Sequence, residues 1–273
     1  MTSLPTKHWA EMGWRDFAAA DMRKVVAVLP VAAIEQHGHH LPVGTDSFIN
    51  QGHLDRVIAR IPADLPVLFL PAQTIGLSSE HAEYPGTLTF SPETLIRAWT
   101  EIGESVARAG CRKLIFINAH GGNVAIIDVV ARDLRLRHAM LAVQAAWGRF
   151  GAPESLYSDA ERAHGIHGGD KETSLMLAFR PETVKMAEAA NFKSAAAGIE
   201  RDNKRLRATQ PIGFGWMASD LNMTGAVGDA SVASMAKGEA TAEVGVAGFL
   251  ELLADVVAFD LETLRPGPLA KAL

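Results

Sequence analysis

The feature of this sequence that most constrains its fold is a regular alternation of short apolar runs with longer stretches of helical periodicity. Four runs have the composition and length of buried strands, and they cover residues 24–33, 66–71, 113–118 and 140–146. Helical spacing is found in residues 47–61, 92–109, 123–138, 172–179 and 233–260. This alternation predicts right-handed crossovers and a mostly parallel sheet with helices on both faces. The predicted fold class is therefore α/β.

Local signals support several of these boundaries. Ser91 is a good N-cap, Pro92 suits a first helical position, and Gly110 suits a helix end. Residues 149–169 are rich in glycine, alanine and polar residues and are predicted to form a long loop. A loop of that length in a compact domain usually has a function. Residues 213–229 form a second glycine-rich stretch.

Length and composition indicate a globular enzyme. The chain has 273 residues, of which 48% are hydrophobic and 21% are charged, as is typical of soluble proteins. Repeats, low-complexity tracts and convincing linkers are absent from the sequence, so a single domain over residues 1–273 is predicted. The single cysteine, Cys111, excludes an internal disulfide framework, fits a reducing compartment and is expected to be a packed small residue.

Charge and hydropathy limit the partners of the chain. A net charge of -5 provides no basic surface for nucleic acid or anionic lipid. The cluster of arginines in residues 201–207 is interpreted as a solvated loop or helix face. The sequence has no apolar run of transmembrane length and no apolar leader in residues 1–13. A cytoplasmic protein with a small-molecule substrate, and without nucleic-acid or membrane partners, is expected.

The strongest chemical signal follows the first predicted strand, in residues 35–46 (EQHGHHLPVGTD). Residues two apart in extended backbone point the same way, so Glu35 and His37 can face one point. Asp46 follows a glycine-containing turn and could bridge two ions through its two oxygens. Two carboxylates and an imidazole suit zinc, manganese or iron. The alternative is a polar loop with hydrogen-bonded histidines, which so many ionisable residues at one strand end make less favourable.

The third predicted strand ends in Asn118-Ala119-His120-Gly121-Gly122-Asn123. His120 should therefore lie at the same carboxyl edge of the sheet as Glu35. Asn123 is expected to cap the next helix. A phosphate-binding loop is the alternative, since glycines precede a helix, but the lysine and serine or threonine of a P-loop are missing.

Two further segments carry candidate residues. Glu172, expected on a first helical turn, could complete a metal site, and His167 in the loop before it could act as an acid or base. Glu172 could equally be a capping carboxylate that interacts with the helix dipole. Glu80 and His81 follow the second strand and could line the pocket or form only a surface turn. A glycine-rich match at residues 213–218 lacks the strand and helix of a dinucleotide site, and no Gly-x-Ser-x-Gly elbow occurs.

Taken together, these segments resemble the creatininase family of amidohydrolases, over residues 29 to about 239. The specific stretches are Glu-x-His-Gly-x-His-Leu-Pro-x-x-Thr-Asp, Asn-x-His-Gly-Gly-Asn and His-x-Gly-x-x-Glu-Thr-Ser. The resemblance implies a three-layer α/β/α sandwich, usually a homohexamer, with two metal ions. It implies that Glu35, Asp46 and His120 hold one ion, and that His37, Asp46 and a further carboxylate hold the other.

One departure from the family pattern concerns the substrate. Family members that act on creatinine carry a glutamate two residues after the histidine that matches His120, and this chain has Gly122 there. Other branches have the Gly-Gly form, and Glu172 is then the remaining carboxylate. The position of His167 matches the catalytic histidine of the family. The resemblance therefore supports the metal centre but not creatinine as substrate.

The predicted function is that of a metal-dependent amidohydrolase, which cleaves a small cyclic or linear amide with water activated by two divalent ions. Zinc is the preferred metal, with manganese or iron as alternatives. His167 and Glu172 are the predicted catalytic residues, and His167 would protonate the leaving nitrogen. Substrate contacts are predicted, more weakly, for Glu80, His81 and Asn123. Two other classes stay open: a non-catalytic metal- and ligand-binding protein, and a phosphate-ester hydrolase that uses the same ions.

Overall fold

The central sheet has four parallel strands. The computed structural model describes residues 4–268. The strands are β1 (Val26–Val31), β2 (Val67–Phe69), β3 (Lys113–Asn118) and β4 (Leu141–Ala146), in the order β2-β1-β3-β4. In the register of the sheet Val26 lies beside both Val67 and Lys113, and Lys113 lies beside Leu141. The predicted α/β fold with a mostly parallel sheet is confirmed, and all carboxyl ends meet at one edge.

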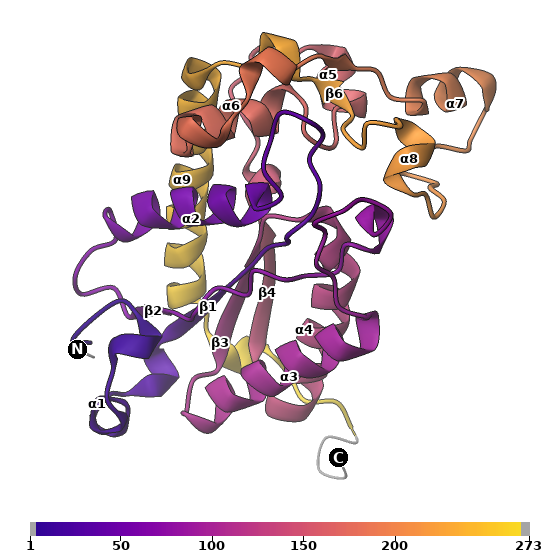
Figure 1. Cartoon of the computed structure of the whole chain (residues 1–273). Helices are drawn as coiled ribbons and strands as arrows, with labels where there is room; N and C mark the ends of the chain where they lie inside the picture. Colours follow the sequence, from indigo (N-terminus) through magenta and orange to yellow (C-terminus); the bar gives the residue numbers. More distant parts are fainter. Residues whose placement is uncertain (1–3, 269–273) are drawn as a thin grey trace.

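Helices cover both faces of the sheet, which gives the three layers (Figure 1). One face carries α3 (Pro92–Arg108) and α4 (Val124–His138), and the other carries α2 (Thr45–Ile58) and α9 (Met235–Ala258). Side chains alternate along each strand. Leu29 of β1 belongs to the core cluster of the α3/α4 face, whereas its neighbour Val28 belongs to the α2/α9 cluster. Because both faces are buried, the strands appear in the sequence as continuous apolar runs.

Helix α3 begins as its sequence predicts. The Ser91 hydroxyl accepts a hydrogen bond from the Thr94 amide at 3.3 Å, and Gly110 follows the helix with a φ of 95°. The cap predicted for the next helix is wrong, because the Asn123 side chain makes no capping bond to α4. Its Oδ1 accepts instead from the Leu77 amide, and its Nδ2 donates to the Ala32 carbonyl oxygen. Asn123 thus ties together three loops at the carboxyl edge of the sheet.

The long loop predicted at residues 149–169 is interrupted by a short helix. Helix α5 (Asp159–His164) begins at Ser158, whose hydroxyl accepts from the Glu161 amide at 3.1 Å. Six residues are too few to show helical periodicity, so the sequence pattern did not reveal it. Helix α6 (Asp170–Phe179) starts two residues before its predicted position and places Glu172 in its first turn, as expected.

The remaining elements are short. They are α1 (Trp14–Ala19), α7 (Ala196–Asp202), α8 (Ala218–Leu221) and the antiparallel pair of β5 (Asn191–Phe192) with β6 (Gly228–Asp229). Single 3-10 turns cover Trp9–Glu11, Met22–Lys24, Ser79–His81, Gly121–Asn123, Trp147–Phe150, Pro181–Thr183, Met186–Glu188, Ala230–Val232 and Leu261–Thr263. Figure 1 shows α5 and α6 above the carboxyl edge of the sheet, with α7 and α8 projecting to one side. No helix within residues 4–268 combines the length and apolarity needed to cross a membrane.

Candidate metal centre and active site

Five of the predicted residues meet at the carboxyl edge of the sheet. Glu35 and His37 lie in the loop after β1, where the Glu35 amide donates to the Val43 carbonyl oxygen at 2.9 Å and folds the loop back on itself. Asp46 lies in the first turn of α2, and His120 is the second residue after β3. Glu172 arrives from the first turn of α6. Segments far apart in the sequence therefore supply one cluster.

The cluster divides into two triads that share Asp46. In one triad, His120 Nδ1 lies 3.2 Å from Glu35 Oε1 and 3.3 Å from Asp46 Oδ2. In the other, His37 Nε2 lies 3.4 Å from Asp46 Oδ1 and 3.8 Å from Glu172 Oε2. Each Asp46 oxygen faces a different histidine. This is the arrangement expected of a carboxylate between two ions.

Hydrogen bonds fix which ring nitrogen each histidine presents to the cluster. His37 Nδ1 donates to the Glu35 carbonyl oxygen at 3.0 Å, and His120 Nε2 donates to the Leu77 carbonyl oxygen at 2.7 Å. The other ring nitrogens, His37 Nε2 and His120 Nδ1, therefore point into the cluster, and each would offer a lone pair to an ion once its ring is neutral. Backbone carbonyls that orient an imidazole in this way are usual around protein-bound metals.

Several buried atoms of the cluster have no hydrogen-bond partner in the part of the chain that the structure describes. They are both carboxylate oxygens of Glu35, Oδ2 of Asp46 and Nε2 of His37. Burying such groups without partners costs roughly 1–3 kcal/mol each, and more when they are charged. Divalent ions would satisfy all of them. The mixed oxygen and nitrogen donors match zinc or a neighbouring transition metal.

The pKa shifts in the cluster show that its carboxylates favour positive charge on the neighbouring histidines. Burial opposes the charged form of His37, but the carboxylates of Asp46 and Glu172 raise its pKa to about 9. Burial also opposes ionisation of Asp46, and His37 and His120 hold the pKa of its carboxyl below the ordinary value. Burial raises the pKa of Glu172. The buried carboxylates are thus balanced by protons on the histidines, which bound ions would replace.

His167 lies against this cluster rather than apart from it. Its ring stacks between His37 and His81, with centroid distances of 4.0 and 4.2 Å. His167 Nε2 donates to the Gln36 carbonyl oxygen at 2.6 Å, so Nδ1 carries the lone pair and faces Glu35 Oε1 at 3.5 Å. Burial and the two neighbouring histidines lower the pKa of His167 well below its ordinary value. Glu35, His37 and His167 also form a possible third ligand group.

The weaker candidates are in the same region, but they differ in their contacts. His81 Nε2 lies 3.5 Å from Glu35 Oε1, while its Nδ1 accepts from the Gln36 side-chain amide at 2.7 Å. Glu80 Oε1 lies 3.7 Å from His120 Nε2. His81 and Glu80 therefore each lie beside a candidate metal ligand, Glu35 and His120 respectively. The Asn123 side chain is fully buried, and its Nδ2 donates to the Ala32 carbonyl oxygen and to Asn118 Oδ1. These contacts do not support the predicted contact of Asn123 with substrate.

A cavity of about 320 Å³ opens beside the metal triads, since His120 and Glu172 are part of its wall. Most of its other walls are apolar, formed by Ile49, Val124, Trp147, Ile166 and Leu175. Lys171 also lines it, and burial lowers the pKa of its ammonium. Lys171 and Trp147 were missed at the sequence level. Lys171 stands directly beside Glu172 and could have been noticed, whereas Trp147 comes from another strand end and gives no local signal.

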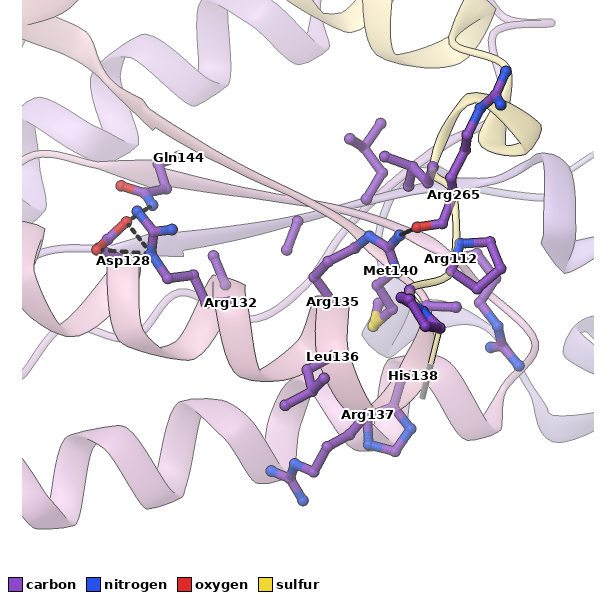
Figure 2. A pocket seen from close by; sticks show the side chains of 18 residues that line it. Arg112, Asp128, Arg132, Arg135, Leu136, Arg137, His138, Met140, Gln144 and Arg265 are labelled. Carbon is purple, nitrogen blue, oxygen red and sulfur yellow. Dashed lines mark hydrogen bonds and ion pairs between the residues drawn. The ribbon is translucent and has the colours of Figure 1, made fainter. Parts of the chain in front are cut away.

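A larger cavity, of about 1540 Å³, lies elsewhere, along the free edge of β4 and the adjacent α4 (Figure 2). Its charged side chains are largely satisfied by their neighbours. Figure 2 shows Arg132 and Gln144 both bonded to Asp128, and Arg135 bonded to the Arg265 carbonyl oxygen. The clustered carboxylates and histidines that could do chemistry lie beside the smaller cavity, whose wall includes His120 and Glu172, and we therefore regard it as the candidate active site.

Comparison with known proteins identifies the family of the chain. The family model described as "Creatininase: Creatinine amidohydrolase" matches residues 10–253. A mycofactocin precursor peptide peptidase of Mycobacterium tuberculosis is 31% identical over 221 residues, which cover 77% of each chain. A creatinine amidohydrolase of Pseudomonas putida is 32% identical over 205 residues, covering 68% of this chain and 76% of the relative.

Solved structures of creatininases also resemble this chain. A manganese form of creatininase superposes with a TM-score of 0.71 at 25% identity, covering 93% of this chain and all of the other. A zinc–zinc form of a creatininase variant gives 0.73 at 25% identity, with 93% and 99% coverage. The fold and the site define a metallohydrolase of the α/β class, and the chain belongs to the creatininase family. The predicted family is confirmed, and so is the predicted class of hydrolases that act on carbon–nitrogen amide bonds.

Proposed function

We propose that this protein hydrolyses a small amide other than creatinine and that it does so with two divalent ions. The observation that carries the proposal is the position of Asp46, whose two oxygens belong to two separate ligand triads with buried, unpartnered donor atoms. Glu35 and His120 would complete one site, and His37 and Glu172 the other. Relatives of known structure exist in manganese and zinc–zinc forms, and zinc is our preferred metal, with manganese or iron as alternatives.

When bound, two divalent ions lower the pKa of water and polarise an amide carbonyl. The chain itself then supplies orientation, exclusion of water and proton transfer. The triads lie on buried strand and helix ends, and the apolar walls of the cavity limit access of bulk water. The buried carboxylates also compensate the charge of the ions, which would otherwise be costly in this setting.

His167 is the residue we assign to proton transfer. Within the described part of the chain its Nδ1 makes no hydrogen bond, and it faces the Glu35 carboxylate. We propose that Nδ1 takes a proton from the attacking water and delivers it to the leaving nitrogen, which cannot depart as an amide anion. Ile166, and not His167, is in the wall of the cavity, so this role requires the scissile bond to approach Glu35. The alternative is that His167 is a metal ligand. The two roles can be distinguished, because replacing a ligand lowers the metal content of the protein and replacing a proton-transfer residue does not.

The exclusion of creatinine follows from the surroundings of Gly122. A Cβ built at this position would collide with the Leu77 carbonyl oxygen and lie 2.5 Å from His120 Nε2. The glutamate of creatinine-hydrolysing relatives therefore has no room here, and Glu172 would take the corresponding role in the second triad.

The test combines elemental analysis with a substrate panel. Purified protein should contain close to two transition-metal ions per chain, and its activity should disappear with a chelator and return with zinc. The panel contains creatinine, hydantoins, formamides, short peptides and a phosphate ester. Hydrolysis of an amide other than creatinine supports the proposal, whereas hydrolysis of creatinine or the phosphate ester alone, or of nothing by the metal-loaded protein, overturns it. The cytoplasmic location and the homohexamer expected from the sequence remain predictions.

A further inference from the structure

Lys171 is a charged residue of the active-site cavity that neither the metal triads nor the proposed reaction uses. It lies in the first turn of α6 and lines the cavity together with His120 and Glu172. The helix dipole disfavours a cation at this end of a helix. A lysine here thus opposes the local preference of the helix, and such conflicts between local preference and structure are expected at functional sites.

The carboxylates beside Lys171 in the sequence are already engaged. Asp170 pairs with the Lys237 ammonium at 2.5 Å. Glu172 Oε2 accepts from the Gly168 amide at 2.6 Å and faces His37. Across residues 4–268, no ion pair or hydrogen bond is found for Lys171 Nζ. Glu172 acts on this ammonium electrostatically without contacting it, so the hydrogen bonds of the ammonium are left for something that enters the cavity.

The rest of the cavity defines what could enter. Its volume of about 320 Å³ corresponds to roughly ten water molecules at ~30 Å³ each, which is enough for a small organic molecule. Five apolar side chains line it. A Cβ at Gly148 would lie 3.7 Å from Lys171 Nζ, so only backbone flanks the ammonium on that side and a ligand atom can approach it.

We propose that Lys171 binds a carboxylate of the substrate, so that the substrate class is a small amide that carries a carboxylate and an apolar group, as an N-formyl amino acid does. This inference rests on the proposed function, because the amide would be presented to the metal triads at the His120 and Glu172 wall of the same cavity. A charge-assisted hydrogen bond of this kind should improve affinity about tenfold to a hundredfold.

The test compares two ligands that differ only in the carboxylate. N-methanesulfonyl-leucine and N-methanesulfonyl-leucinol resist hydrolysis, and their affinities for the zinc-loaded protein are measured by calorimetry. N-formyl-leucine and N-formyl-leucinol serve as the corresponding substrates. Each is assayed with the wild-type protein, with Lys171→Met, which keeps an unbranched side chain but removes the charge, and with Lys171→Arg. Metal content and thermal unfolding confirm that each variant is folded and loaded.

We expect the wild-type protein to bind the acid at least tenfold more tightly than the alcohol. Lys171→Met should lose that difference and bind the alcohol within twofold of wild type, while Lys171→Arg should retain part of it. Equal binding of acid and alcohol by the wild-type protein, or equal weakening of both in Lys171→Met, overturns the inference even if both formamides are hydrolysed. A binding difference that depends on Lys171, without hydrolysis of these formamides or of any other amide in the panel, supports the ligand class but contradicts the proposed function.

Discussion

Asp46 and His37 approach each other through only one oxygen of the carboxylate, with 3.4 Å between Oδ1 and Nε2. The second oxygen, Oδ2, is buried without a hydrogen-bond partner among the described residues and faces the other triad. Removal of the aspartate should therefore affect both ions, whereas removal of the histidine should affect one. This asymmetry is the basis of the first prediction.

Asp46→Ala should lose both ions, and His37→Ala should keep close to one ion per chain. Inductively coupled plasma analysis after gel filtration measures both. Asp170→Asn is the matched control, because Asp170 is also buried and acidic but pairs with Lys237 away from the triads, and it should keep both ions. Full metal content in a folded Asp46→Ala protein would show that Asp46 does not bridge them.

Creatinine should be a poor substrate or none. The space around Gly122 cannot hold a side chain without displacing Leu77 or His120, so Gly122→Glu should lower metal content rather than create creatinine hydrolysis. Steady-state assays with creatinine check both proteins. Turnover by the wild-type chain at an ordinary enzymatic rate, a kcat of roughly 1 per second or more, contradicts the prediction.

His167 and Glu172 should fail in different ways if the proposed roles are right. His167→Ala should keep its metal and lose roughly a hundred- to ten-thousand-fold in rate, which is the contribution of a general acid or base. The loss should be smaller for activated anilides, because their leaving amines need less protonation. Glu172→Gln should lose metal instead, since an amide offers no charge to the ion. Loss of metal in His167→Ala would identify His167 as a ligand.

A histidine outside the triads should make the stability of the metal-free protein depend on pH. His53 is buried, stacks on Trp147 at 4.3 Å, and donates from Nδ1 to the Ile49 carbonyl oxygen. Burial lowers its pKa to about 4, against roughly 6.5 in the unfolded chain. The unfolded state therefore binds more protons between these values. The stability contribution is complete above pH 6.5 and is lost as the pH falls toward 4.

The expected loss from His53 between pH 7.5 and pH 5.5 is about 1 kcal/mol. Urea unfolding of the chelator-treated protein at both pH values measures it. His53→Leu, of similar size and without a titratable ring, should be less stable at both values but should show a difference smaller by that amount. An unchanged difference would mean that the pKa of His53 is the same in the folded and unfolded states, so that its burial does not shift the pKa.

The sequence predicted the sheet and the main helices because both leave strong patterns. Residues 113–118 are an apolar run buried on both faces, and they match β3 in full. Helix α3 has both a capping serine and a periodic apolar stripe. Helix α5 has six residues and α8 has four, which is too short for periodicity. The prediction of a single domain is not tested by any of these observations.

The site was predictable where ligands follow strands, because parallel strands end at one edge. That rule places Glu35 and His120 together without further information. The contacts of Gln36 with His81, and of Asn123 with Leu77, join segments that are far apart in the sequence. Such pairings depend on how the loops fold over the carboxyl edge of the sheet, so the local sequence does not predict them. The side-chain cap of α4 is missing for the same reason, because the Asn123 side chain forms tertiary hydrogen bonds instead.

The two triads that share Asp46 also have a consequence for the stability of the folded protein. Two of the proposed ligands lie between β1 and α2, one lies in the first turn of α2, one follows β3, and one is on α6. Two bound ions would therefore connect three segments that lie far apart in the sequence. Binding to the folded state alone stabilises a protein by about 2.7 kcal/mol when the free ligand is at a hundred times its dissociation constant. The lifetime of the folded enzyme would then follow the metal supply of its surroundings, and starvation for metal would remove the protein as well as its activity.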